Sequence, residues 1–335
     1  MDPGRERREL LGRLISSQAH VELLTAFHSN PSLMESLEGL ANRIGRSREE
    51  VEKALEDLKD VGLIEEHRYY RLNMGRDKEL QGILVEPYGG LDEQVEAAPR
   101  VSFKSGVEVL DGLLPDGIPI PSSILILSDP RAGGEVLGFQ IVGEALRNGR
   151  RVLYLTADRS PREVKRFVKH LGYDVDFYHQ GRRLIFLDCY SPRIGLESGE
   201  EYSEDPFNFP NLSMTLAGLI RDLKADQPGE LLVMIHSLTT ILEGSELRPA
   251  LEFYRNISGK LESAGAVTFT HLNRAAFPAA VIAAVEDVAD GVIELKIEET
   301  VEGINYYARV PKMILIRHET RWTPYRLDVE KGLIP

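Results

Sequence analysis

The stretch SSILILSDPRAGGEVLGFQIVGEALRNGR, residues 122–150, decides the fold of this chain. Its apolar run ILIL, residues 124–127, predicts a buried strand. A turn containing a proline and two glycines follows, and apolar residues from 136 to 146 then recur at helical spacing. A strand, a glycine-bearing turn and a helix in this order form the layout of a phosphate-binding loop.

The turn lacks the chemical groups that such a loop uses. The pattern is G-x-x-x-x-G-K-[ST], in which backbone N–H groups surround the phosphates, the Lys reaches their outer oxygens and the hydroxyl holds Mg²⁺. The corresponding eight residues, beginning at Ser128, read S-D-P-R-A-G-G-E. Gly133 keeps the second glycine, but Gly134 stands in place of the Lys and Glu135 in place of the hydroxyl residue. Because a carboxylate repels a polyphosphate, the stretch predicts the architecture of the site without its chemistry.

Composition limits the classes of protein to which the chain can belong. Its 335 residues favour two domains, and a net charge of −13 argues against a dominant nucleic-acid surface, although a local basic patch is compatible with it. The single cysteine, Cys189, excludes an intrachain disulfide, and we expect it to be a small buried hydrophobe. The N-terminus is too charged for a signal peptide, and no apolar run approaches the roughly 20 residues of a membrane-spanning helix. We therefore expect a soluble, cytoplasmic protein.

Residues 1–74 contain a small helical unit. Three helices are predicted between residues 16 and 61, and the third begins with a capping box formed by Ser47 and Glu50. Two short strands that end at Leu72 then form a wing. In the spacing of its apolar residues the unit resembles a winged helix-turn-helix domain, which implies that its third helix lies in a major groove when DNA is bound.

The charges of this unit leave two interpretations open. Arginines cluster at the turn before the third helix and on the wing, and the candidate DNA contacts are Arg43, Arg46, Arg48, Arg68 and Arg71. The third helix, residues 48–60, carries six acidic side chains against three basic ones, and an acidic helix repels phosphates. We therefore favour a protein-docking or spacer role over DNA binding.

The pattern changes after a predicted linker at residues 75–99. In residues 100–335 strands and helices alternate, which predicts a parallel sheet with crossover helices. Strands are expected near 152–156, 184–188, 231–236 and 266–270, and helices near 160–171, 213–224 and 247–263. Beyond residue 291 we expect antiparallel additions to one edge of the sheet, near 292–297, 306–310, 313–316 and 325–329.

Four segments of residues 100–335 occur in the order found in the KaiC-like branch of the RecA-like ATPases, which this part of the chain resembles. They are SFKSGVEVLDGLLPDGIPIPSSILILSDP, RRVLYLTADRSPREVKRFVKHLGYD, LLVMIHSLTTIL and MILIRHETRWTPYRLDVEKGLIP. The resemblance implies an α/β fold of RecA type, with a mainly parallel sheet, flanking helices and antiparallel C-terminal strands. It also implies ATP binding between adjacent subunits, with a K-x-R strand that reaches the neighbour's phosphate.

The same resemblance assigns the remaining catalytic positions. His236 stands where an acidic residue ends the Walker B strand, Asp158 is the survivor of two catalytic carboxylates, and Lys312 is the survivor of the K-x-R pair. Phosphoryl transfer depends on positioning and on charge neutralisation by Lys, Arg and Mg²⁺, and most of these groups are missing. Arg131 is a loop cation that could replace the Lys, although an exposed loop charge is the simpler interpretation.

These substitutions predict a pseudo-ATPase with a regulatory or scaffolding role, without catalytic residues and without a cofactor. Two alternatives stay open: a nucleotide-responsive DNA-binding transcriptional regulator, and a weak ATPase that binds ATP and Mg²⁺ in a non-standard loop. No metal site is expected, since His236, His271 and His318 follow no ligand-type spacing. The expected partner is a protein, either a second copy or a KaiC-like paralogue; DNA is the alternative through the winged helix, and no membrane partner is expected.

Overall fold

The computed structural model describes residues 17–29, 33, 35–66, 70–72, 102–223, 229–301, 303–314 and 316–335. The chain divides into two compact units, residues 1–99 with 147–149 and residues 100–146 with 150–335. Within the described ranges, no helix combines the length and the apolar character needed to cross a membrane.

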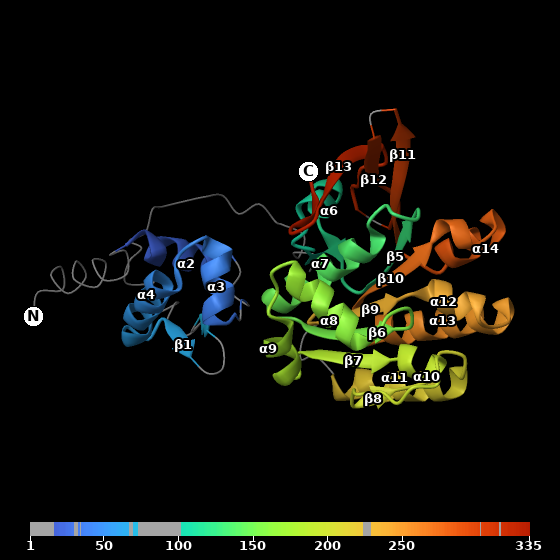
Figure 1. Cartoon of the computed structure of the whole chain (residues 1–335), viewed down its shortest axis with the longest axis horizontal. Coiled ribbons are helices and arrows are strands. Elements are labelled where there is room, and N and C mark those ends of the chain that lie inside the picture. Colours follow the sequence, from blue (N-terminus) through green and yellow to red (C-terminus); the bar gives the residue numbers. More distant parts are fainter. Residues whose placement is uncertain are drawn as a thin grey trace, which may run out of the picture. The chain divides into compact units, whose positions relative to one another are not determined.

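Among the residues of the first unit that the structure describes, three helices and a two-stranded antiparallel sheet are present (Figure 1). The elements are α2 (Gln18–Ser29), α3 (Leu37–Ile44), α4 (Arg48–Asp60), β1 (Ile64–Glu66) and β2 (Tyr70–Leu72). The predicted capping box of Ser47 and Glu50 is present at the start of α4. Apolar side chains that recur every three or four residues give each helix one buried face, and Leu23, Leu40 and Leu55 meet in one core. The winged-helix assignment itself stays a prediction.

A ten-stranded sheet organises the second unit, in the order β14-β13-β12-β11-β5-β10-β9-β6-β7-β8 (Figure 1). Its strands are β5 (Ser122–Ser128), β6 (Arg151–Thr156), β7 (Leu184–Asp188), β8 (Tyr202–Ser203), β9 (Leu231–His236), β10 (Val267–Asn273), β11 (Gly291–Thr300), β12 (Gly303–Met313), β13 (Thr323–Asp328) and β14 (Gly332–Ile334). The strands from β11 to β8 in this order are parallel, and β12, β13 and β14 are antiparallel. The strands β3 (Ser102–Phe103) and β4 (Ile118–Pro119) form a separate antiparallel pair.

Helices cover both faces of this sheet. One face packs against α6 (Glu108–Leu113), α7 (Gly134–Arg147), α8 (Pro161–His170) and α9 (Val175–Gln180). The other packs against α11 (Phe209–Asp222), α12 (Leu238–Glu243), α13 (Leu247–Ser263) and α14 (Ala279–Glu286), and the short α10 (Tyr190–Arg193) follows β7.

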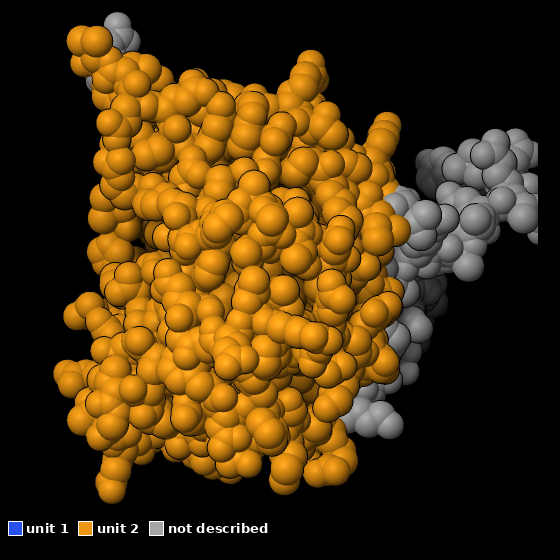
Figure 2. Space-filling view, turned by 90° about the vertical axis from the view of Figure 1, so that its right-hand side faces the viewer, with its two compact units in different colours: residues 1–99, 147–149 blue, residues 100–146, 150–335 orange. Residues whose placement is uncertain are grey.

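The position of β5 between two layers of helices explains why its residues 124–127 are all apolar. Ile124 and Ile126 lie in one core and Leu125 and Leu127 in the other, because successive side chains of a strand point to opposite faces. A strand that is covered on both faces has no polar side. Figure 2 shows one face of the second unit (orange) with the side chains drawn as spheres.

Two expectations about the C-terminal strands were wrong. A separate strand at 313–316 is not found among the described residues: β12 is one continuous strand that ends at Met313, and residues 314 and 316 belong to no strand. Strand β11 is not an antiparallel addition: it runs parallel to β5, and the antiparallel part begins only with β12. Helix α14, which was not predicted, connects β10 to β11 and allows β11 to run in the same direction as its neighbours.

Candidate functional site

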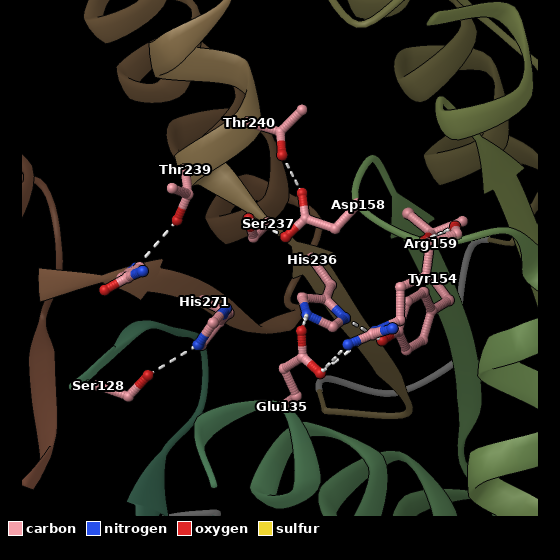
Figure 3. Close-up of polar contacts among 12 residues, drawn as sticks. Ser128, Glu135, Tyr154, Asp158, Arg159, His236, Ser237, Thr239, Thr240 and His271 are labelled. Atoms are coloured by element: carbon pink, nitrogen blue, oxygen red, sulfur yellow. Dashed lines mark hydrogen bonds and ion pairs between the residues drawn. The ribbon is translucent and has the colours of Figure 1, made fainter. Parts of the chain in front are cut away.

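The residues that replace the nucleotide-binding groups gather at the carboxyl ends of the adjacent strands β5, β10, β9 and β6 (Figure 3). Ser128 ends β5, His271 lies near the end of β10, His236 ends β9 and Asp158 follows β6. This edge of an open α/β sheet is where ligands normally bind. The fold therefore brings Ser128, Asp158 and His236 together among the sequence-predicted positions.

The loop between β5 and α7 is held by the C-terminal strands. Gly133 has a φ of 79°, a conformation that favours glycine, and a Cβ there would lie 3.0 Å from Leu327 Cδ1. The hydroxyl of Tyr325 donates a hydrogen bond to the carbonyl oxygen of Ala132. Gly133, the retained glycine of the pattern, thus allows the loop to pack closely against β13.

Gly134 has no room for a side chain. A Cβ at this position would lie 2.4 Å from Ser128 Oγ, 2.7 Å from Ser128 Cβ and 2.7 Å from His271 Nε2. Ser128 Oγ and His271 Nε2 are themselves 2.9 Å apart and share a buried hydrogen bond. Burial, and after it the neighbouring His236, lowers the pKa of His271 to about 3, so its ring is neutral at physiological pH. A neutral, hydrogen-bonded Ser–His pair therefore fills the space that a lysine side chain would enter.

Glu135 is neutralised within the chain. Its Oε2 accepts hydrogen bonds from Arg159 Nη2 at 2.8 Å and from Arg159 Nε at 3.2 Å (Figure 3). Burial by itself would raise the pKa of Glu135, but His236 and Arg159 outweigh it and lower that pKa to about 2. Glu135 is therefore an anion, and it is paired with the guanidinium of Arg159.

His236 is buried, with 2% of its surface exposed. Its Nδ1 lies 2.7 Å from the hydroxyl oxygen of Tyr154, and the two groups share a hydrogen bond. Its Nε2 lies 3.6 Å from Glu135 Oε1, beyond hydrogen-bond range, and has no hydrogen-bond partner among the described residues. The imidazole is thus oriented through one nitrogen and presents the other to Glu135.

Asp158 is held by two hydroxyl groups from the segment after β9. Ser237 Oγ donates to Asp158 Oδ2 at 2.6 Å, and Thr240 Oγ1 donates to Asp158 Oδ1. The surviving carboxylate is therefore positioned at the site. Its charge and that of Glu135 place two anions where a polyphosphate would lie.

The two candidate cations for a phosphate have partners within the chain. Arg131 has a φ of 71°, and its Nη2 lies 2.5 Å from Glu299 Oε1, with both side chains 63% exposed. Lys312 Nζ donates to the backbone oxygen of Glu286 at 2.8 Å. Arg131 is thus exposed and paired with Glu299, and Lys312 has an intrachain contact at the end of α14.

The candidate DNA contacts of the first unit are described in part. Arg46 is bound by Glu22, with Nε 2.8 Å from Oε2 and Nη2 2.9 Å from Oε1. Arg43 lies in the last turn of α3, and Arg48 is the first residue of α4. Arg68 lies outside the described residues, and the side chain of Arg71, on β2, lies outside them as well. The central cation of the predicted cluster is thus already paired.

The site does not fit Mg²⁺-ATP. A lysine at position 134 has no space, position 135 carries a carboxylate in place of a hydroxyl, and Asp158 adds a second carboxylate within 4.8 Å. In this fold the phosphates need cations at these positions. The residues present therefore supply neither the phosphate-binding cation nor the Mg²⁺-binding hydroxyl.

Sequence reasoning missed three residues of the site: Tyr154, Arg159 and, as the partner of Ser128, His271. Arg159 comes directly after Asp158, so its position after a strand was a usable signal. Tyr154 and His271 sit inside apolar strands, and nothing in their local pattern distinguishes them from structural residues. Their roles depend on which strands lie next to each other.

The second unit has relatives among known proteins. The family model described as "ATPase: KaiC" matches residues 103–334. A UPF0273 protein of Aeropyrum pernix is 24% identical over 236 residues, covering 69% of this chain and 92% of the relative. A UPF0273 protein of Pyrobaculum aerophilum is 28% identical over 145 residues, 43% of this chain and 49% of the relative.

A solved structure supports the same fold. The KaiC-like protein of the hyperthermophilic archaeon Pyrococcus horikoshii OT3 superposes with a TM-score of 0.58 at 20% sequence identity, over 70% of this chain and 99% of that protein. The match to the family covers well over half of the chain and includes the ten-stranded sheet and the candidate site. The chain therefore belongs to the KaiC family of ATPases.

Proposed function

We propose that this chain is a pseudo-ATPase of the KaiC family that acts as a regulatory or scaffolding subunit. The observation that carries the proposal is that no side chain fits at position 134, because the Ser128–His271 pair occupies the place that it would take. The pattern G-x-x-x-x-G-K-[ST] has glycine at its first position and lysine at its seventh. Here the first position has a side chain and the seventh has none, so the two substitutions compensate each other sterically.

The charges of the site support the same proposal. The Glu135–Arg159 ion pair is half-buried, with 34% and 33% of the two side chains exposed. To hold Mg²⁺ and a triphosphate, the site would have to break this pair and accept further negative charge beside two carboxylates. An enzyme that transfers phosphoryl groups stabilises that charge; this site repels it.

The test is nucleotide binding and turnover by the full chain. Calorimetric titration with ATP, with and without Mg²⁺, is expected to give no binding at millimolar nucleotide, and ATP hydrolysis is expected to stay at background. A turnover near 1 s⁻¹, a usual value for enzymes, that is abolished by Glu135→Ala would contradict the proposal. Glu201→Ala is the matched control, because Glu201 is an exposed acid on the loop before β8.

The partner that we propose is a catalytically competent KaiC-like subunit. The family resemblance puts Lys312 on the strand that reaches a neighbour's phosphate. Docking would exchange its present contact with the neutral Glu286 carbonyl for a contact with a phosphate, in which both groups are charged and which is the stronger of the two. A subunit of this kind could occupy one position of a mixed assembly without binding nucleotide itself.

Light scattering of mixtures tests this partner. Mixed with an active KaiC-like protein of the same source, the chain should form a complex that requires ATP and is weakened by Lys312→Ala. The matched control is Lys260→Ala, since Lys260 is an exposed lysine of α13. A complex that ignores both ATP and Lys312, or no complex at all, would exclude this mode of association.

A further inference from the structure

The degenerate site contains three side chains of the types that bind transition metals. Glu135, Asp158 and His236 each offer one ligand atom, and these atoms all lie within 4.8 Å of one another (Figure 3). The three residues come from the start of α7, the turn after β6 and the end of β9. They converge only because β6 and β9 are neighbours and β5, which leads into α7, is close by in the same sheet.

His236 supplies an independent sign of a ligand. Its Nε2 is buried, has no hydrogen-bond partner within the described part of the chain, and points at Glu135 Oε1 from 3.6 Å. A buried polar nitrogen that lacks a hydrogen bond is unfavourable. A bound cation between Nε2 and the carboxylates would remove that penalty.

Each of the three side chains also has an outer partner that fixes its direction. Tyr154 holds His236 through Nδ1, Ser237 and Thr240 hold Asp158, and Arg159 holds Glu135 through Oε2 only. Metal-ligating histidines and carboxylates characteristically have such outer hydrogen bonds. The oxygen Glu135 Oε1 faces His236 and is left free by Arg159 for a metal.

We propose that Glu135, Asp158 and His236 bind one divalent transition-metal ion, of the class represented by Zn²⁺, in place of Mg²⁺-ATP. The proposal rests on the proposed function in one respect, namely that nucleotide does not take the site.

The ligand set favours Zn²⁺ over Mg²⁺. An imidazole nitrogen with two carboxylate oxygens suits Zn²⁺, which binds three protein ligands and leaves a fourth position open. Mg²⁺ is usually held by carboxylates together with substrate phosphates, and it retains its water. The two carboxylates offset the charge of a divalent ion, while Arg159 stays hydrogen-bonded to Glu135 Oε2.

Binding requires a small contraction of the site. With metal–ligand bonds of about 2.1 Å, tetrahedral ligand atoms lie about 3.4 Å apart. The present separations are at most 4.8 Å, so they have to close by no more than roughly 1.4 Å. Glu135 and Asp158 are both only half-buried, so their side chains can move toward the fixed imidazole. The hydroxyl groups of Ser237 and Thr240 can follow the carboxylate that they hold.

The experiment is a calorimetric titration of the metal-stripped full chain with Zn²⁺, with Co²⁺ absorption as a second measure of coordination geometry. We expect one equivalent to bind at micromolar or lower Kd, and Mg²⁺ to give no comparable binding. His236→Gln and Asp158→Asn should each weaken Zn²⁺ binding at least 10-fold. Tyr154→Phe, which removes an outer partner and no ligand, should weaken it about 10-fold without changing the stoichiometry.

The matched control is His170→Gln, because His170 is an exposed histidine in the last turn of α8. The proposal is overturned if Zn²⁺ does not bind, if binding survives both His236→Gln and Asp158→Asn, or if His170→Gln abolishes it. If His236→Gln fails to fold, Asp158→Asn decides the test, because its amide keeps an acceptor for the hydroxyl contacts.

Repeating the titration with ATP separates the metal proposal from the pseudo-ATPase proposal. Tight ATP binding would refute the pseudo-ATPase assignment, whereas a failure of Zn²⁺ alone would leave that assignment standing.

Discussion

Adding one methyl group at Gly134 tests the steric basis of the lost nucleotide site. The Cβ of Gly134→Ala would lie 2.4 Å from Ser128 Oγ and 2.7 Å from Ser128 Cβ. The Oγ could rotate only by losing its hydrogen bond with His271, and the Cβ moves only with the backbone of β5. The substitution must therefore disturb a buried strand, a buried hydrogen bond, or both.

The expected cost follows from these contacts. Overpacking in a core costs about 1–3 kcal/mol, and the loss of one hydrogen bond adds roughly 0.5–1.5 kcal/mol. The better helix propensity of Ala returns up to about 1 kcal/mol. We expect Gly134→Ala to lower the free energy of unfolding of the second unit by about 1–3 kcal/mol.

The matched control lies four residues along the same helix. A Cβ at Gly138 would meet Met234 Cε at 3.5 Å and Sδ at 3.6 Å, which is ordinary van der Waals contact. Gly138→Ala should therefore leave stability unchanged or raise it by up to about 1 kcal/mol. The two substitutions are chemically identical and differ only in their surroundings.

Urea unfolding monitored by tryptophan fluorescence is a suitable assay. Trp322 is the single tryptophan of the chain, and the cations of Lys296 and Arg309 lie 4.5 Å and 4.3 Å from its ring centroid. Its emission therefore reports the folding of the second unit. If Gly134→Ala proves as harmless as Gly138→Ala, the steric explanation for the absent lysine is wrong.

A double-mutant cycle sharpens the test. Ser128→Gly removes two of the three atoms that a Cβ at position 134 would meet and leaves only His271 Nε2, so Gly134→Ala should cost at least about 1 kcal/mol less in that background. The same reasoning predicts that Gly134→Lys alone destabilises the chain and does not restore ATP binding. Additive effects of the two substitutions would show that they do not compensate each other.

Three further outcomes are expected. Cys189 is buried, and burial followed by the charge of Asp188 raises the pKa of its thiol, so a thiol reagent should label it only after unfolding; rapid labelling of the native chain would contradict this. Gln140→Ala removes side-chain hydrogen bonds to the backbone of residues 331–333, so amide exchange in β14 should accelerate while that in β9 stays unchanged. Arg46→Ala should change the affinity for duplex DNA less than about twofold, because its guanidinium is already bound by a carboxylate; a larger loss in an anisotropy titration would restore Arg46 as a phosphate contact.

The sequence pattern predicted those elements that depend only on residues close together in the chain. The apolar run of β5, the capping box at Ser47 and the alternation of strands and helices were all readable, because each depends on neighbouring residues. The same pattern could not tell that β11 runs parallel to β5. An apolar, alternating segment has the same signature in either direction, and the direction depends on the connection through α14.

The sequence by itself determined which chemical groups are missing from the nucleotide site, since residue types at positions 134, 135 and 236 are sufficient for that. Only the tertiary structure decided what replaces them. Arg159 neutralises Glu135 across 24 positions, and His271 reaches Ser128 across 143. Such pairs arise because parallel strands bring their carboxyl ends to one edge of the sheet, however far apart they are in the chain. Strand order and side-chain rotamers set these contacts, and neither is encoded in a local pattern.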